Sequence, residues 1–261
     1  MKPFKIRASA AGSIMAGNVG LSEPQQKKLI TFQDKVKAGK ELTLLQAAEN
    51  DKLLKLLSNP QLPAGAKTYC EVWHKEQIYE RRKEISGGPL EKGNFCEDES
   101  IRFLNIQLLD DHVKNEIYKE DEWMTGTADI ISGDMVIDMK NSFTFDTFPL
   151  HDFGIKNKDY FYQLQVYMHL YGKQRAELRY ALMNMPHHMI ERAAKREAYY
   201  TNSEYDDVFT KVYNQLTYDK IDPKYRYKIF KIEFDPSIIE EVKKRVILCR
   251  KYITELDERI K

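Results

Sequence analysis

Apolar and polar residues alternate with a period of two over residues 126–140, which is the pattern of half-buried β-strands. Gly133-Asp134 interrupts the alternation, and a Gly-Asp pair between two β-branched runs is typical of a two-residue hairpin turn. With that turn, Ile130 lies opposite Ile137. One face of the predicted hairpin is apolar and is expected to point into the core; it carries Ala128, Ile130, Met135, Ile137 and Met139.

In other parts of the chain the apolar residues recur every three or four positions, which predicts helices. Two of these helices begin with a capping box, at Ser22 with Gln25 and at Thr43 with Gln46. A Gly-Gly-Pro break at residues 87–89 separates the third helix from the fourth. The expected helices cover residues 23–38, 44–57, 66–84, 90–108, 159–171 and 238–259.

Further strands are expected at residues 116–123, 176–183 and 227–234. A hairpin followed by a helix and two more strands implies a mixed sheet with helices on both faces, so the fold class is α/β, in the broad sense that includes α+β. The chain of 261 residues is long enough for one large domain. Within this single domain, residues 1–89 are expected to form an N-terminal helical part, and residues 90–261 the core and the C-terminal helix.

The composition is that of an ordinary globular protein, with 42% hydrophobic and 31% charged residues. The net charge of +1 gives no overall basic field, although an acidic metal site can cancel a basic groove in this sum. Cys70, Cys96 and Cys249 fit no C-x-x-C pattern, so a disulfide framework, a zinc ribbon and an iron–sulfur cluster are not expected. No stretch reads as a signal peptide or a membrane span, which makes the cytoplasm the expected location and a membrane partner unexpected.

Several enzyme classes lack their sequence signatures. No G-x-S-x-G, Walker A or G-x-G-x-x-G motif occurs, which disfavours serine hydrolases, NTPases and dinucleotide enzymes. The six histidines show no i, i+4 metal spacing and are expected to be structural or surface residues.

The polar face of the predicted hairpin carries the candidate chemistry. Its register places Asp129 directly opposite Asp138, and like charges in that position are destabilising unless something neutralises them. A divalent cation would do so, and oxygen ligands favour Mg²⁺ or Mn²⁺ over zinc. Lys140, two residues beyond Asp138, points to the same face. The alternative is an ordinary hairpin with scattered surface charge.

Two helices add candidate residues to this site. Glu97 lies in an acidic run, which is usually a solvated face, unless the helix leans this carboxylate towards the same cation. Gly93 would permit a close approach of that helix to the sheet or to DNA. Gln163 lies in a strongly aromatic helix, where a buried amide needs partners such as water or a phosphate oxygen. Tyr167, one turn further on, would share its face.

Four short motifs follow one another along the chain. They are Gly93-x-x-x-Glu97, Gly126-x-x-Asp129, Asp138-x-Lys140 and Gln163-x-x-x-Tyr167. In this order they resemble the PD-(D/E)XK nuclease superfamily, and within it the lambda-exonuclease or YqaJ-type phage recombination exonucleases. The resemblance covers residues 5–183 and implies a restriction-endonuclease-like core with extra N-terminal helices.

The segment 6–15 looks like the N-terminal region of this family, in which a serine helps to hold the DNA end. The match makes Ser9 the expected phosphate contact, with Arg7 as a second DNA-binding candidate. A helix N-cap is the alternative role for Ser9.

The chain departs from the family pattern at three places. Asp138 stands where these exonucleases usually have Glu, and Ala128 stands where a Pro is usual. The predicted helix at residues 44–57 is an addition, which leaves the geometry of any oligomer open.

The resemblance implies a Mg²⁺ site, with Mn²⁺ as a substitute, that holds one or two ions. Its ligands would be Glu97, Asp129, Asp138 and the backbone carbonyl of Met139. Lys140 would orient the attacking water, Gln163 would position Lys140 or the phosphate, and Tyr167 would contact DNA.

The implied function is that of an exonuclease that degrades linear double-stranded DNA, with 5′-to-3′ polarity, in phage-type recombination. Two alternatives stay open: a structure- or site-selective DNA endonuclease, and a catalytically inactive DNA-binding protein on a nuclease fold. Related exonucleases form ring-shaped trimers, so a homo-oligomer is expected. If the chain comes from a phage, a single-strand annealing protein is the natural partner, in the cytoplasm of a bacterial host.

Overall fold

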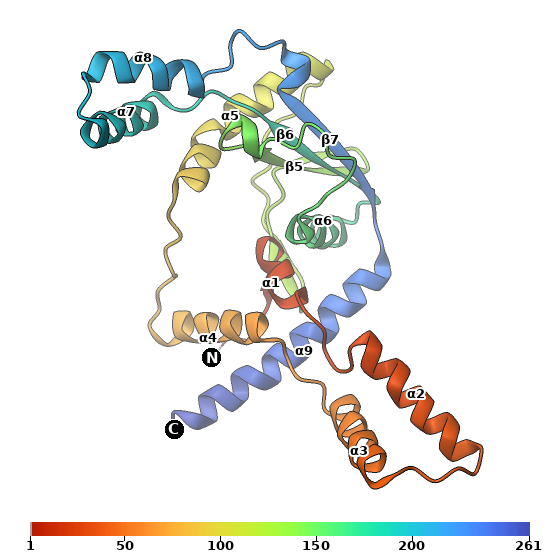
Figure 1. Ribbon diagram of the computed structural model, residues 1–261. Helices are drawn as coiled ribbons and strands as arrows, with labels where there is room; N and C mark the ends of the chain where they lie inside the picture. Colours follow the sequence, from red (N-terminus) through yellow and green to blue (C-terminus); the bar gives the residue numbers. More distant parts are fainter. Residues whose placement is uncertain (1) are drawn as a thin grey trace. The chain divides into compact units, whose positions relative to one another are not determined.

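The computed structural model describes residues 2–261, which form two compact units (Figure 1). The first unit comprises residues 2–6, 10–83 and 240–261, and the second comprises residues 7–9 and 84–239. Each unit has its own buried apolar residues.

The first unit is helical. Its helices are α1 (Ala11–Met15), α2 (Glu23–Lys37), α3 (Leu44–Ser58), α4 (Ala64–Ile78) and most of α9 (Pro236–Arg259). Both predicted capping boxes are present, because Gln25 Oε1 accepts a hydrogen bond from the Ser22 N–H at 2.8 Å and Gln46 Oε1 accepts one from the Thr43 N–H at 3.3 Å. The predicted third helix is too long at its end, because Glu80 has a positive φ of 52° and cannot continue it.

The C-terminal helix groups with the N-terminal helices, whereas the division by sequence placed it with residues 90–261. Its polar side chains explain this placement. Arg250 of α9 donates to the Phe4 carbonyl at 3.0 Å, and Tyr252 donates to Glu71 of α4 at 2.7 Å. Cys249 is fully buried and forms a hydrogen bond with Cys70 of α4.

The second unit is the mixed α/β part of the chain, and the predicted fold class is confirmed. Its strands are β2 (Lys119–Glu120), β3 (Met124–Gly126), β4 (Ile130–Ser132), β5 (Met135–Asn141), β6 (Arg175–Ala181) and β7 (Tyr227–Glu233). Its helices are α5 (Gly88–Leu108), α6 (Lys158–Tyr171), α7 (His187–Thr201) and α8 (Tyr205–Leu216).

The main sheet of this unit has the strand order β4-β5-β6-β7, in which β5 and β6 are parallel and the other neighbours are antiparallel. A smaller sheet has the order β1-β3-β2, where β1 is the short strand Ile6–Arg7. The strand structure expected at residues 116–123 is shorter than predicted, because β2 covers Lys119–Glu120. Asp121 accepts hydrogen bonds from the N–H groups of Trp123 and Met124 at 2.7 and 2.8 Å, and this turn makes a hairpin of β2 and β3.

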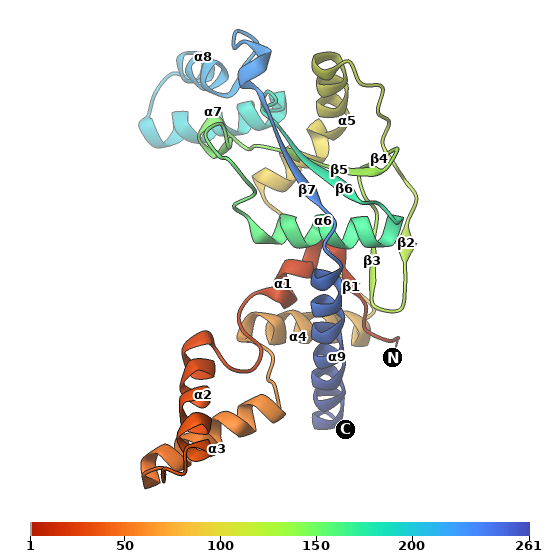
Figure 2. The ribbon, with the colours of Figure 1, turned by 90° about the vertical axis from the view of Figure 1, so that its right-hand side faces the viewer.

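The central hairpin has the predicted register, with Ile130 opposite Ile137. Gly133 begins its turn with φ of 53°, a conformation that glycine adopts without strain. The apolar face packs on Ile101 and Leu104 of α5. Helix α6 covers the opposite face of the sheet (Figure 2), so Asp138 and Lys140 of β5 point towards α6.

Helices α7 and α8 were not among the predicted elements. They pack on each other through an apolar cluster that includes Met189, Ala194, Val208 and Val212. None of the helices in the described part of the chain combines the length and the apolar character needed to cross a membrane.

Two glycines of the family-like motifs differ in what surrounds them. A Cβ atom on Gly126 would lie 2.8 Å from Cε1 of Tyr167 and 2.9 Å from the Cβ of Ala8, so β3 passes close to α6 only because this residue is glycine. A Cβ atom on Gly93 would meet nothing within 4 Å. The predicted close approach of α5 to the sheet at Gly93 is therefore wrong, and its approach to DNA stays a prediction.

We expect Gly126→Ala to lower the free energy of unfolding by about 1–3 kcal/mol, because overpacking forces backbone or side-chain shifts. Gly93→Ala is the matched control, since it adds the same methyl group in a helix with open space and should raise stability by about 0.5–1 kcal/mol. Urea denaturation measures both variants. Equal stability of the two variants would contradict the close packing at Gly126.

Candidate active site

Asp129 and Asp138 come together at the open end of the central hairpin, as predicted. Asp129 directly precedes β4, and Asp138 lies in the middle of β5 with 1% of its surface exposed. The Met139 N–H donates to Asp129 Oδ2 at 2.7 Å, which holds the first carboxylate against the neighbouring strand. The two side chains are close enough for the charge of Asp138 to act on Asp129.

The environment of this pair opposes two negative charges. Burial, followed by the charge of Asp138, raises the pKa of Asp129 to about 7. Burial also raises the pKa of Asp138, although the ammonium of Lys140 opposes that effect. The pair therefore favours a neighbouring cation, and its hard oxygen donors suit Mg²⁺ or Mn²⁺.

Lys140 supplies one positive charge on the same face of β5. Its Nζ lies 2.5 Å from Asp138 Oδ2 and 4.9 Å from the centre of the Tyr160 ring. Burial acts against the ammonium form, but the charges of Asp138 and Asp129 outweigh it and raise the pKa of Lys140. Lys140 therefore keeps its proton, and its positive charge, at neutral pH.

Gln163 of α6 is buried, and other side chains of the protein accept hydrogen bonds from its amide nitrogen. Its Nε2 donates to Asp138 Oδ1 at 3.0 Å and to the Tyr167 hydroxyl at 3.1 Å. The amide therefore contacts the carboxylate of Asp138, and the expected action of Gln163 on Lys140 or on a phosphate stays a prediction.

Tyr167 is 5% exposed, and its ring packs against Gly126. Burial is the main cause that raises the pKa of its hydroxyl. The side chain is enclosed between α6 and β3, and the expected contact of Tyr167 with DNA stays a prediction. Its role in this structure is to hold Gln163.

Glu97 of α5 lies near the pair, because its charge contributes to raising the pKa values of Asp129 and Asp138. Its carboxylate forms an ion pair with Lys114, with Oε2 and Nζ 2.9 Å apart. Within residues 2–261, no three His, Cys, Asp or Glu side chains are grouped closely enough to hold a metal ion together. The carboxylates of Asp129 and Asp138 thus lie together, whereas the carboxylate of Glu97 is paired with Lys114.

Asn115 and Tyr171 are site residues that the sequence analysis missed. The Asn115 N–H donates to the Asp129 carbonyl at 2.7 Å, and its Nδ2 donates to the Ala128 carbonyl at 2.8 Å. Asn115 Nδ2 and the Ala128 N–H both donate to the Tyr171 hydroxyl, each at 3.2 Å. Tyr171 follows Tyr167 at i+4 on the Gln163 face of α6, a spacing that predicts it; no sequence pattern marks Asn115.

Ser9 lies exposed in the 3₁₀ turn Ala8–Ala10, and Arg7 precedes this turn in β1. The N-cap of α1 is Ala10, so the alternative role of Ser9 as a helix cap is wrong. Ala8 contacts the Gly126 region of β3, three residues before Asp129. The contact of Ser9 and Arg7 with DNA stays a prediction.

Comparison with known proteins gives similar structures but no similar sequences. No protein-family description and no curated protein matches the chain. A phage-related exonuclease from Haemophilus somnus 129PT superposes with a TM-score of 0.70 at 20% identity, over 100% of this chain and 98% of that chain. The alkaline exonuclease LHK-Exo from Laribacter hongkongensis superposes with a TM-score of 0.57 at 13% identity, over 98% and 91% of the two chains.

LHK-Exo in complex with dAMP gives a similar TM-score of 0.56, over 98% of this chain and 89% of that chain. At these identities the likeness establishes the fold alone. The predicted mixed α/β fold is confirmed, and the chain shares it with these exonucleases.

The pKa of Asp129 gives a prediction for metal binding. Since an ion must displace the proton that Asp129 holds below pH 7, the affinity for Mn²⁺ is expected to rise between about pH 6 and 8, by up to about tenfold per pH unit below the pKa. Titration calorimetry at several pH values measures this. Asp134→Asn, a change in the exposed hairpin turn, should keep the same dependence, and a flat affinity in the unsubstituted protein would contradict the raised pKa.

Proposed function

We propose that this protein is a Mg²⁺-dependent exonuclease that hydrolyses the phosphodiester bonds of linear double-stranded DNA, with 5′-to-3′ polarity. The observation that carries the proposal is the buried pair Asp129 and Asp138 beside Lys140, on a fold shared with two exonucleases. A nuclease of this type needs oxygen ligands for a divalent cation next to a donor that faces the scissile phosphate.

The residues of the site fit a divalent cation. Asp129 and Asp138 would hold it, with Glu97 and the carbonyl of Met139 as further ligands for one or two Mg²⁺ ions or for Mn²⁺ in their place. When bound, such an ion lowers the pKa of a water molecule and stabilises the charge that develops on the phosphate oxygens.

The chain's own groups complete the reaction. Lys140 is held by Asp138 and by the ring of Tyr160, and from there its ammonium orients the attacking water or donates to a phosphate oxygen. Gln163 fixes the carboxylate of Asp138 and so the distance at which Lys140 acts. Attack of water on phosphorus breaks the P–O3′ bond and leaves a 5′-phosphorylated nucleotide.

The expected substrate is a DNA end. The complex of LHK-Exo with dAMP shows that a protein of this fold binds a deoxynucleotide. Ser9 is exposed in a turn that packs near Gly126, and we assign to it and to Arg7 the contact with the terminal phosphate. The proposal extends to phage-type recombination, with a single-strand annealing protein as partner and a ring of identical copies as the assembly.

Lys140→Ala is expected to lower cleavage at least about 100-fold, because it removes a donor aimed at the reacting phosphate. Binding of DNA and of Mn²⁺ should remain. The measurement is mononucleotide release from end-labelled linear duplex with a 5′-phosphate in the presence of Mg²⁺, with the exposed Lys220→Ala as the matched control. Cleavage by Lys140→Ala at the rate of the unsubstituted protein would contradict the role of this lysine in cleavage.

The same assay separates the alternatives when covalently closed circles and single strands are included. Mononucleotides from linear duplex alone support the exonuclease. Nicked circles would identify an endonuclease, and DNA binding without any product in Mg²⁺ or Mn²⁺ would identify an inactive DNA-binding protein.

Ser9→Ala should raise the KM for a 5′-phosphorylated duplex by about tenfold, since a hydrogen bond to a charged group contributes about 1.5–3 kcal/mol. The KM for a duplex with a 5′-hydroxyl should stay the same. Ser203→Ala, in the exposed connection after α7, serves as the control. An equal effect of Ser9→Ala on both substrates would show that Ser9 does not bind the terminal phosphate.

A further inference from the structure

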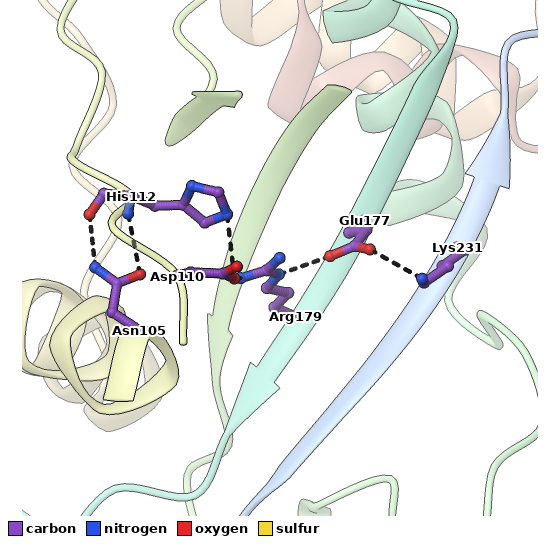
Figure 3. Close-up of polar contacts among 6 residues, drawn as sticks. All are labelled: Asn105, Asp110, His112, Glu177, Arg179 and Lys231. Carbon is purple, nitrogen blue, oxygen red and sulfur yellow. Dashed lines mark hydrogen bonds and ion pairs between the residues drawn. The ribbon is translucent and has the colours of Figure 1, made fainter. Parts of the chain in front are cut away.

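The segment between α5 and β2 contacts residues of the candidate site. Its residues 110–117 are called the strap here. One end of the strap is fixed to the sheet and to α5 (Figure 3). Asp110 Oδ2 accepts a hydrogen bond from Arg179 Nη1 of β6 at 2.8 Å. Asn105 of α5 holds His112 through both backbone groups, donating to its carbonyl at 2.8 Å and accepting from its N–H at 3.2 Å.

The anchor on the sheet is the buried side chain of Arg179. Its side chain is only 5% exposed, and its Nε donates to the equally buried Glu177 at 2.7 Å. Glu177 in turn lies 3.5 Å from Lys231 of β7, whose side chain is exposed (Figure 3). A buried guanidinium that loses a partner is strongly destabilising, so the place of Asp110 is closely specified.

Further along the strap, the consecutive residues Lys114 and Asn115 contact two of the proposed metal ligands, Glu97 and Asp129. Asn115 bonds through its backbone to Asp129 and through its side chain to Ala128. Lys114 forms the ion pair with Glu97. The hydroxyl of Tyr171 closes this arrangement, because it also donates to the Ile117 carbonyl.

Asp129 needs such support because it lies outside the sheet ladder. The β4–β5 pairing begins at Ile130, so no strand hydrogen bond fixes the backbone of Asp129. Its carboxylate nevertheless lies close enough to Asp138 to be repelled by the charge of that buried side chain. The backbone carbonyl of Asp129 is held instead by the hydrogen bond from the N–H of Asn115.

We propose that the strap positions both carboxylate sides of the site: Asn115 sets the place of Asp129, Lys114 sets the place of Glu97, and the ion pair of Asp110 with Arg179 fixes the strap itself. Asn115 is a positioning residue, since it contacts the backbone and not the carboxylate. The inference rests on the proposed function, in which these carboxylates bind a divalent cation.

The test measures Mn²⁺ affinity by titration calorimetry, together with cleavage and thermal unfolding. Asn115→Ala is expected to weaken Mn²⁺ binding about tenfold or more, as is typical for groups that orient metal ligands. Excess Mn²⁺ should then restore cleavage. Tyr171→Phe keeps the ring but removes the hydroxyl, and it should weaken Mn²⁺ binding in the same direction with little change in folding.

A second pair of variants tests the anchor. Asp110→Asn keeps the shape of the side chain but removes the charge that faces Arg179, and Mn²⁺ binding should weaken several-fold. Lys231→Ala removes the exposed end of the same chain of charges and should leave Mn²⁺ affinity unchanged. Equal, small effects of the two variants would overturn the role of the anchor.

The outcomes separate this inference from the proposed function. Unchanged Mn²⁺ affinity in Asn115→Ala and Tyr171→Phe, in a protein that binds Mn²⁺ and cleaves DNA, overturns the strap and leaves the nuclease standing. Loss of Mn²⁺ binding only in parallel with unfolding in both variants also overturns it. A protein without substitutions that neither binds Mn²⁺ nor cleaves DNA overturns the proposed function, and the strap with it.

Discussion

The repulsion between two buried carboxylates on one hairpin is the constraint that the second unit is built around. Asp129 and Asp138 are placed together by the strand register, and burial strengthens their repulsion because the surroundings are less polar than water. Lys140, Gln163 and the N–H of Met139 each oppose it with a positive charge or a hydrogen-bond donor. These donors come from β5 and α6, so the sheet and this helix must keep their places for the pair to persist.

The part of this arrangement that follows local rules could be predicted from the sequence. A period of two and a Gly-Asp turn determine which residues of the hairpin face each other, and the register between Ile130 and Ile137 is the predicted one. The capping boxes at Ser22 and Thr43 are equally local. For the same reason the face of β5 that carries Asp138 and the fold class were accessible without the structure.

The contacts that depend on tertiary packing could not be predicted in this way. Gln163 carried a signal as a polar residue in an apolar helix, but nothing in the sequence indicated that its partner is Asp138. The spacing of Tyr167 from Gln163 gives the face of the helix on which it lies, but not that β3 covers that face. Asp110 and Asn115 lie in a polar connection without periodicity, and their partners are many residues away in the chain.

The two carboxylates differ in a way that bears on cation binding. The oxygens of Asp138 contact Lys140 and the Gln163 amide, whereas the Asp129 carboxylate accepts a hydrogen bond from the backbone N–H of Met139. A cation would therefore relieve more repulsion at Asp129, where the pKa has risen to about 7, than at Asp138, whose charge is already shared with Lys140. Asp129 is also the carboxylate whose backbone lies outside the ladder. The less neutralised carboxylate is thus the one whose backbone is held by Asn115 and Tyr171.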